Sequence, residues 1–162
     1  MSDLIEEWKN KKGEKSHENR KFLKRLAKQK NKKLDEQAEQ IHQEVFTEID
    51  CLTCANCCKS IPPIVNKTDA ARIAKDLGMK PAKFQDEYLI IDEDGDMVMN
   101  TSPCPFLLDD NKCLIYDIRP KACRAYPHTN NYEFSKRMKL HDKNANYCPG
   151  VFHILERLKK VK

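Results

Sequence analysis

Glycine is scarce in this sequence of 162 residues, with four glycines at positions 13, 78, 95 and 150. No two of them stand close enough together to form the glycine-rich loop that cradles a phosphate, or the fingerprint of dinucleotide-binding folds. The composition therefore excludes a nucleotide-binding loop of either kind.

Long apolar stretches are absent as well. No run of about 18 apolar residues, the length of a transmembrane helix, occurs in the sequence, and residues 1–15 lack the apolar stretch of a secretory signal. We therefore predict a cytoplasmic protein without a membrane span. Because thiols stay reduced in that compartment, its cysteines are expected to bind metal. A disulfide framework would fit only an exported protein.

Basic and acidic side chains are separated along the first 50 residues, although the net charge of the whole chain is only +5. The segment from Lys9 to Lys33 contains twelve Lys and Arg residues and only two acidic residues, Glu14 and Glu18. The simplest interpretation of this run is the solvated face of a helix. The alternative is a surface that binds RNA, the ribosome or a protein partner. Aromatic residues are sparse there, which argues against base stacking.

The same segment has helical periodicity. Apolar residues recur at spacings of three and four at Leu34, Ala38, Ile41, Val45 and Ile49, which predicts one buried stripe. We expect one long helix, or two in line, over residues 18–49, with the first dozen residues frayed. The domain prediction is a charged helical N-terminal extension over 1–50 and a cysteine-rich domain over 51–162.

The second part is predicted to hold short elements between turns. Thr68-Asp69 and Gly78 delimit a helix, Pro81 begins another over 81–88, and the acidic run 92–96 is a hairpin turn between 88–91 and 97–99. We further expect a second hairpin over 106–116, a helical turn around Cys123, and an amphipathic helix over 151–161. The predicted fold class is α+β: a small, irregular domain with short hairpins, organised by its cysteine and metal sites.

The eight cysteines carry the chemical signal. Four lie within eight residues, and the other four are spread over the rest of the domain: Cys51, Cys54, Cys57 and Cys58, then Cys104, Cys113, Cys123 and Cys148. Two cysteines separated by two residues can turn both sulfurs toward one ion. Three at this spacing can hold three corners of a cubane cluster, with a remote fourth ligand such as Cys104 or Cys148, each followed by proline.

How the thiols divide is left open by the spacing. Adjacent side chains diverge in most backbone conformations, so Cys57 and Cys58 are expected to serve different sites unless one is not a ligand. Eight thiolates make two four-sulfur sites, or one iron–sulfur cluster with spare thiols. Some of the cysteines could also be buried as small apolar side chains.

The chain resembles a known family at these residues. The segments CLTCANCC (51–58), PCPFL (103–107) and CLIYDIRPKACRAYP (113–127), with the late Cys148, resemble the CxxCxxCC family of YkgJ-like cysteine-cluster proteins, which carry a zinc- or iron-chelating domain. The resemblance covers about residues 50–150. The cluster also occurs in the larger flagellin lysine-N-methylase, where it is associated with an iron–sulfur centre. The resemblance implies that all eight cysteines serve metal binding and implies little about a reaction.

Several neighbours of the cysteines are candidates for supporting roles. Arg119 and Arg124 flank Cys123 and could donate N–H groups to thiolate sulfur. His128 and His153 could replace thiolates as ligands, although eight cysteines already fill two sites. His17, His42 and His141 lie in polar stretches and carry no signal, whereas Tyr116 and Tyr126 are expected in the core.

The leading hypothesis is a metal-binding protein that coordinates a 4Fe–4S cluster or zinc, with a slight preference for iron–sulfur. The segment 51–58, the region 103–127 and Cys148 are expected to converge on one centre. One alternative is an enzyme that uses the cluster for methyl transfer or redox chemistry, but no residue stands out as catalytic, so the sequence leaves enzymatic activity open. The other is an RNA- or ribosome-associated protein that binds through Lys9–Lys33.

Overall fold

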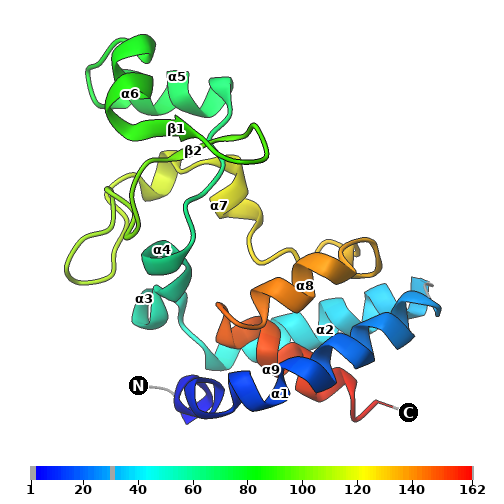
Figure 1. Cartoon of the computed structure of the whole chain (residues 1–162). Helices are drawn as coiled ribbons and strands as arrows, with labels where there is room; N and C mark the ends of the chain where they lie inside the picture. The colour runs from blue at the N-terminus through cyan, green and yellow to red at the C-terminus, as the bar shows by residue number, and fades with distance from the viewer. Residues whose placement is uncertain (1–2, 30–31, 162) are drawn as a thin grey trace. The chain divides into compact units, whose positions relative to one another are not determined.

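The chain folds into two compact units (Figure 1). The computed structural model describes residues 3–29 and 32–161. The terminal unit comprises Met1–Cys54 and Pro127–Lys162, and the central unit is Ala55–Tyr126.

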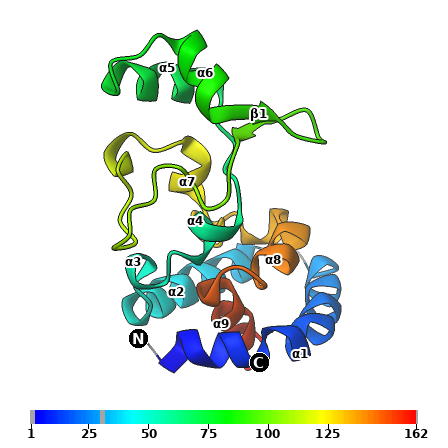
Figure 2. The same cartoon turned by 60° about the vertical axis from the view of Figure 1, so that its left-hand side comes forward.

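The terminal unit is built of helices. It contains α1 (Asp3–Ala27), α2 (Lys32–Glu48), α3 (Cys51–Cys54), the 3₁₀ turn η2 (Phe134–Lys136), α8 (Met138–Asn144) and α9 (Pro149–Leu158). Helix α9 packs against both α1 and α2, and α1 also packs against α8 (Figures 1 and 2). Because α9 is enclosed in this way, nearly all of its residues are buried. The apolar stripe of α2 is therefore covered by the C-terminal helix.

The start of the chain differs from the prediction. The first dozen residues were expected to fray, yet α1 begins at Asp3 and buries Ile5 and Trp8. The Trp8 indole nitrogen donates a hydrogen bond of 2.9 Å to the carbonyl oxygen of Ala145. This tertiary hydrogen bond holds the first turns of α1 in place, and no local sequence pattern predicts it.

The predicted helix over 18–49 is also not continuous. Helix α1 ends at Ala27 and α2 begins at Lys32, while residues 30–31 lie outside the described part. The two helices are not in line: they run in different directions, and both pack on α9 (Figure 1). The predicted stripe is confirmed, since its five apolar residues from Leu34 to Ile49 are all buried.

The central unit consists of short elements. These are α4 (Asn56–Ser60), α5 (Lys67–Asp76), α6 (Pro81–Tyr88), β1 (Leu89–Ile91), β2 (Met97–Met99), the 3₁₀ turn η1 (Tyr116–Ile118) and α7 (Lys121–Ala125). Asn66 rather than Thr68 caps α5, through a capping box with Asp69. Gly78 follows α5 with a φ of +70°, as its position predicted.

The first predicted hairpin is confirmed. Strands β1 and β2 are antiparallel, with Ile90 opposite Val98. The carboxylate of Asp92 accepts hydrogen bonds from the backbone N–H groups of Asp94 and Asp96, and Gly95 has a φ of +83°. The second predicted hairpin is wrong in extent. It is reduced to one bridge between Leu107 and Cys113, because the chain enters a 3₁₀ turn at Tyr116.

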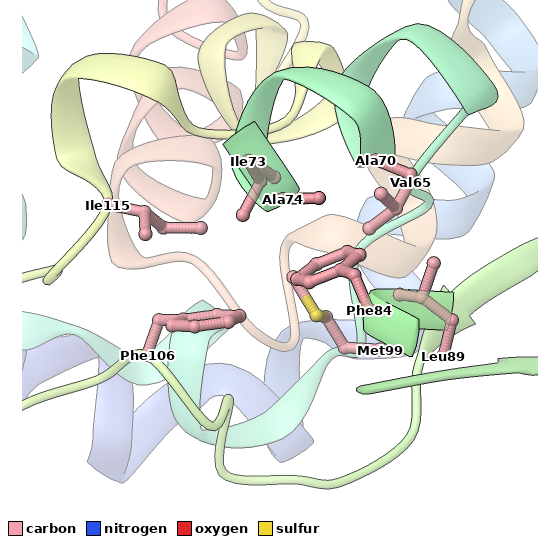
Figure 3. Close-up of a cluster of buried hydrophobic side chains, with 9 residues drawn as sticks. All are labelled: Val65, Ala70, Ile73, Ala74, Phe84, Leu89, Met99, Phe106 and Ile115. Atoms are coloured by element: carbon pink, nitrogen blue, oxygen red, sulfur yellow. The ribbon is translucent and has the colours of Figure 1, made fainter. Parts of the chain in front are cut away.

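The core of the central unit is a cluster contributed by both hairpin strands, two helices and the 106–115 loop (Figure 3). Phe84 lies near its middle, and its ring stacks on Phe106 with centroids 6.3 Å apart. The side chains of Cys104 and Cys113 pack against this cluster. With its small antiparallel sheet among helices, the chain is an α+β protein. No helix in the described residues is long and apolar enough to span a membrane.

Candidate metal centres

Five of the cysteines belong to the central unit, where backbone contacts gather four of them. The N–H of Cys104 donates to the carbonyl oxygen of Cys58 at 2.8 Å. The bridge between Leu107 and Cys113 then brings Cys113 back beside the segment that begins at Cys104. These contacts place Cys58, Cys104 and Cys113 on neighbouring pieces of chain at the edge of the core.

Cys123 is positioned by an ion pair that the sequence analysis missed. Asp69 is 2% exposed and accepts hydrogen bonds from Arg72 at 2.7 Å and from the N–H of Lys121 at 3.2 Å. Arg72 in turn donates to the carbonyl oxygens of Ile118 and Arg119. These bonds fix the start of α7, which carries Cys123. The spacing of Asn66 and Asp69, typical of a capping box, was the available signal.

The thiols of the central unit influence one another's ionisation. Burial, followed by negative charge on Cys58, Cys104 and Cys113, raises the pKa of Cys123 to about 12. Burial also raises the pKa values of Cys104 and Cys113, although the backbone N–H groups of Phe106 and Ile115, respectively, donate to their sulfurs and act in the opposite direction. Without a cation, deprotonation of Cys104, Cys113 and Cys123 is therefore unfavourable.

Cys57 and Cys58 differ in environment. A hydrogen bond from the Cys57 thiol lowers the pKa of Cys58 to about 7, outweighing the opposing effect of burial. The Cys57 carbonyl oxygen accepts the N–H of Ile61 at 2.8 Å. The two neighbouring thiols therefore interact with each other and do not simply diverge.

The predicted arginine neighbours behave differently from each other. The charge of Arg119 lowers the pKa of Cys113 and of Cys123, although burial prevails in both. Its guanidinium lies 4.0 Å from the centre of the Tyr116 ring and donates to the Tyr116 carbonyl oxygen. Tyr116 is 52% exposed, so its predicted core position is wrong. Arg124 is exposed, and Tyr126 is half-buried.

The other three cysteines lie in the terminal unit. Cys51 and Cys54 bound α3, whose first turn is capped by Asp50 through the N–H of Leu52. Cys148 precedes α9, and its N–H donates to the carbonyl oxygen of Asn144 at 2.7 Å. Burial raises the pKa of Cys148 to about 12, with a further contribution from Cys51 and Cys54. The N–H groups of Val151 and Gly150 donate to the Cys148 sulfur.

The histidines serve the fold. His153 is buried, and its Nε2 bonds the carbonyl oxygen of Leu4 at 2.7 Å, while His128 is half-buried in a left-handed conformation with a φ of +68°. His141, which the sequence analysis dismissed, is fully buried. Its Nε2 donates to the carbonyl oxygen of Phe134 at 2.8 Å, and burial lowers its pKa to about 4. Its position in a polar stretch concealed this role.

Several cysteine thiols lie near one another, but they do not surround a common metal position. As the described side chains stand, no group of three or more His, Cys, Asp or Glu residues is arranged to hold a metal ion. No disulfide joins any of the described cysteines. Buried thiols that resist ionisation and accept backbone N–H groups nevertheless fit a soft divalent metal or an iron–sulfur cluster, because the metal stabilises the thiolate form. Convergence of all eight on one centre would join residues of both units and stays a prediction.

Comparison with known proteins agrees with this chemistry. Residues 50–149 match the CxxCxxCC family, described as "Putative zinc- or iron-chelating domain". The match spans more than half of the chain, so the protein belongs to this family. No curated protein and no solved structure matches the chain.

Proposed function

We propose that the protein binds zinc or an iron–sulfur cluster through its cysteine thiolates. The observation that carries the proposal is the grouping of thiols within each unit, illustrated by Cys123 among Cys58, Cys104 and Cys113. A metal or cluster would compensate the charge that burial otherwise disfavours. The proposal includes all eight cysteines as the candidate ligand set, from Cys51 to Cys148.

Between zinc and an iron–sulfur cluster, we slightly favour a 4Fe–4S cluster. The spacing of Cys51, Cys54 and Cys57, with remote cysteines followed by proline, is compatible with cluster ligation. Zinc is supported by the same thiolate chemistry, since four thiolates satisfy a tetrahedral structural site. Either form requires reduced thiols, which supports our proposal of a cytoplasmic location.

The test is purification of the full chain without oxygen, followed by elemental and sulfide analysis. We expect iron with sulfide and a visible absorbance, or zinc, at about one to two centres per chain. Complete removal of the metal should reduce the near-ultraviolet circular dichroism, because the buried thiols would lose the charge that organises them. A folded chain that contains neither metal would contradict the proposal.

A second candidate function, binding to RNA, is favoured by one observation on α1. Several basic side chains between Lys9 and Lys33 form ion pairs with carboxylates, as Lys11 does with Glu7. Among the described residues, Lys21, Lys24 and Lys28 form no ion pair and are exposed. Lys21 and Lys24 are three residues apart on α1 and share one face of the helix, and Lys28 directly follows its last residue, Ala27. This face could contact the phosphates of RNA.

Salt dependence of RNA binding tests this second candidate. Replacing Lys21, Lys24 and Lys28 together by Gln should reduce the slope of log affinity against log salt by about 2 for single-stranded RNA. The matched control replaces Lys9 and Lys11, which already pair with Glu6 and Glu7. Equal effects of both variants, or no binding by the wild type, would remove this candidate.

A further inference from the structure

We propose that the basic surface of α1 continues onto α8 and that the two helices together bind the phosphate backbone of a nucleic-acid duplex. The two-helix basic patch comprises Lys21 and Lys24 on α1 and Lys139 and Lys143 on α8. This inference rests on the second candidate function, RNA binding. It adds a helix that lies outside the charged N-terminal run and involves no cysteine.

Two contacts fix how α8 lies along α1 (Figure 1). The indole nitrogen of Trp8 donates to the carbonyl oxygen of Ala145, which directly follows α8, at 2.9 Å. Further along α1, the Nε of Arg20 lies 3.2 Å from a carboxylate oxygen of Asp142. A later residue of α1 therefore meets an earlier residue of α8, so the two helices run in roughly opposite directions.

Two lysines lie about one helical turn beyond the ion pair of Arg20 and Asp142. Lys24 follows Arg20 by four residues on α1, and Lys139 precedes Asp142 by three residues on α8. At these spacings each lysine lies on the same side of its helix as the paired residue. Because the helices run in opposite directions, both lysines lie in the same direction from the ion pair. They therefore flank the line of contact between α1 and α8.

Lys21 and Lys143 widen this surface. Lys21 precedes Lys24 by three residues and Lys143 follows Lys139 by four, so each shares a helix face with its neighbour. All four lysines are exposed, and none forms an ion pair with another described residue. The single acidic residue of α8 is already paired with Arg20. The patch therefore presents positive charge from two segments that are far apart in sequence.

The side chains of the patch fit the phosphates of a duplex better than the bases of a single strand. Proteins that bind single strands use aromatic rings on which the bases stack. The aromatic residues of α1, Trp8 and Phe22, are buried, and α8 contains no Phe, Tyr or Trp. Duplexes are recognised largely through their shape and their phosphates, which lysines can contact without stacking. Duplex RNA and duplex DNA share this chemistry.

The experiment measures binding of the full chain, purified without oxygen, to a labelled RNA duplex of about 16 base pairs. Replacing Lys139 and Lys143 together by Gln should lower the affinity and reduce the slope of log affinity against log salt by about 2. The matched control replaces Lys9 and Lys11 by Gln, which removes the same charge from lysines that already form ion pairs. The control should change the slope much less.

The same titration with a DNA duplex and with one strand of the RNA identifies the source of the phosphates. Equal affinity for both duplexes assigns the patch to duplex backbones in general, and tighter binding of the RNA duplex assigns it to RNA. The single strand should bind more weakly than either duplex. A single strand that binds as tightly as the duplexes would contradict the assignment.

The outcomes separate this inference from the proposals on which it rests. A wild type that binds no nucleic acid would refute the RNA candidate and the patch together. Binding that depends on Lys21 and Lys24 but not on Lys139 and Lys143 would refute the patch alone. The metal content should be the same in all variants, so the metal proposal is tested separately.

Misfolding of a variant is recognised independently. Trp8 is the single tryptophan, and its hydrogen-bond partner Ala145 directly follows α8. Its fluorescence therefore reports whether α8 still packs on α1. Weaker duplex binding by the α8 variant supports the patch only if this fluorescence is unchanged. If it changes, replacing Lys139 alone by Gln, which should reduce the slope by about 1, decides the outcome.

Discussion

Two glycines in helices should respond in opposite directions to the same substitution. Gly13 lies exposed in α1, and an added Cβ atom would meet nothing within 4 Å. Gly13→Ala should therefore raise the free energy of unfolding by about 0.5–1 kcal/mol, because alanine loses less backbone entropy in a helix. Gly150 lies in α9 against Phe46, where the added Cβ atom would come within 2.3 Å of Cζ and 2.9 Å of Cε1.

The ring of Phe46 must move if Gly150 becomes alanine. Overpacking of this kind costs about 1–3 kcal/mol, and the helix propensity of alanine offsets part of that cost. We expect the free energy of unfolding of Gly150→Ala to fall by about 1–2 kcal/mol. The ring cannot yield without cost, because it also lies against His42, with centroids 4.6 Å apart.

Urea unfolding of the metal-saturated protein, followed by far-ultraviolet circular dichroism, measures both changes. A Phe46→Leu background should remove much of the penalty at Gly150 and leave the gain at Gly13 unchanged, which a double-mutant cycle reports. Stabilisation by Gly150→Ala, similar to that by Gly13→Ala, would refute the close packing of α9 on α2.

Three further predictions concern single side chains. Trp8→Ala should lower the free energy of unfolding by about 3–5 kcal/mol, whereas Trp8→Phe should cost less because it loses mainly the bond to Ala145; equal and negligible effects in urea unfolding would mean that α1 frays. Asp69→Ala should lower the free energy of unfolding by about 1.5–3 kcal/mol and weaken metal retention. The control, Asp110→Ala at an exposed carboxylate, should change the free energy of unfolding by no more than about 0.5 kcal/mol. Equal melting temperatures of the two variants would contradict this. The pKa of His141 is about 4 in the fold against an ordinary 6.5, so the unfolded chain binds the extra proton and roughly 3 kcal/mol of stability should be lost as pH falls from 6.5 to 4. His141→Gln should flatten this slope, and an unchanged slope would contradict the assignment.

Local signals predicted most of the central unit. Pro81 begins α6 and Gly78 follows α5 because each residue favours the backbone conformation found at that position. Helix α8 was missed, since its sequence is polar and the printed contacts of the buried His141 are with Phe134, outside the helix, whose ring stacks on it and whose carbonyl oxygen accepts its hydrogen bond. The start of α1 was misjudged for the same reason, as its anchor is a hydrogen bond to Ala145.

The cysteines were identifiable from spacing, but their grouping was not. The spacing of Cys51, Cys54 and Cys57 predicts one shared site. The chain, however, passes from one unit to the other between Cys54 and Ala55, and no periodicity in the sequence indicates this boundary. Cys148 directly precedes α9 and Cys51 follows α2 closely, and these two helices pack together although they lie far apart in sequence. Asp69 was read as a helix cap, whereas its second role at α7 depends on tertiary structure.

We expect metal to stabilise the two units to different degrees. The terminal unit buries apolar stripes from α1, α2 and α9, and the hydrogen bonds of Trp8 to Ala145 and of His153 to Leu4 involve no cysteine side chain. The central unit has a smaller core, and two of the side chains packed against it are Cys104 and Cys113 themselves. Because a metal that binds only the folded form stabilises it directly, metal should contribute a larger share of the folding free energy in the central unit.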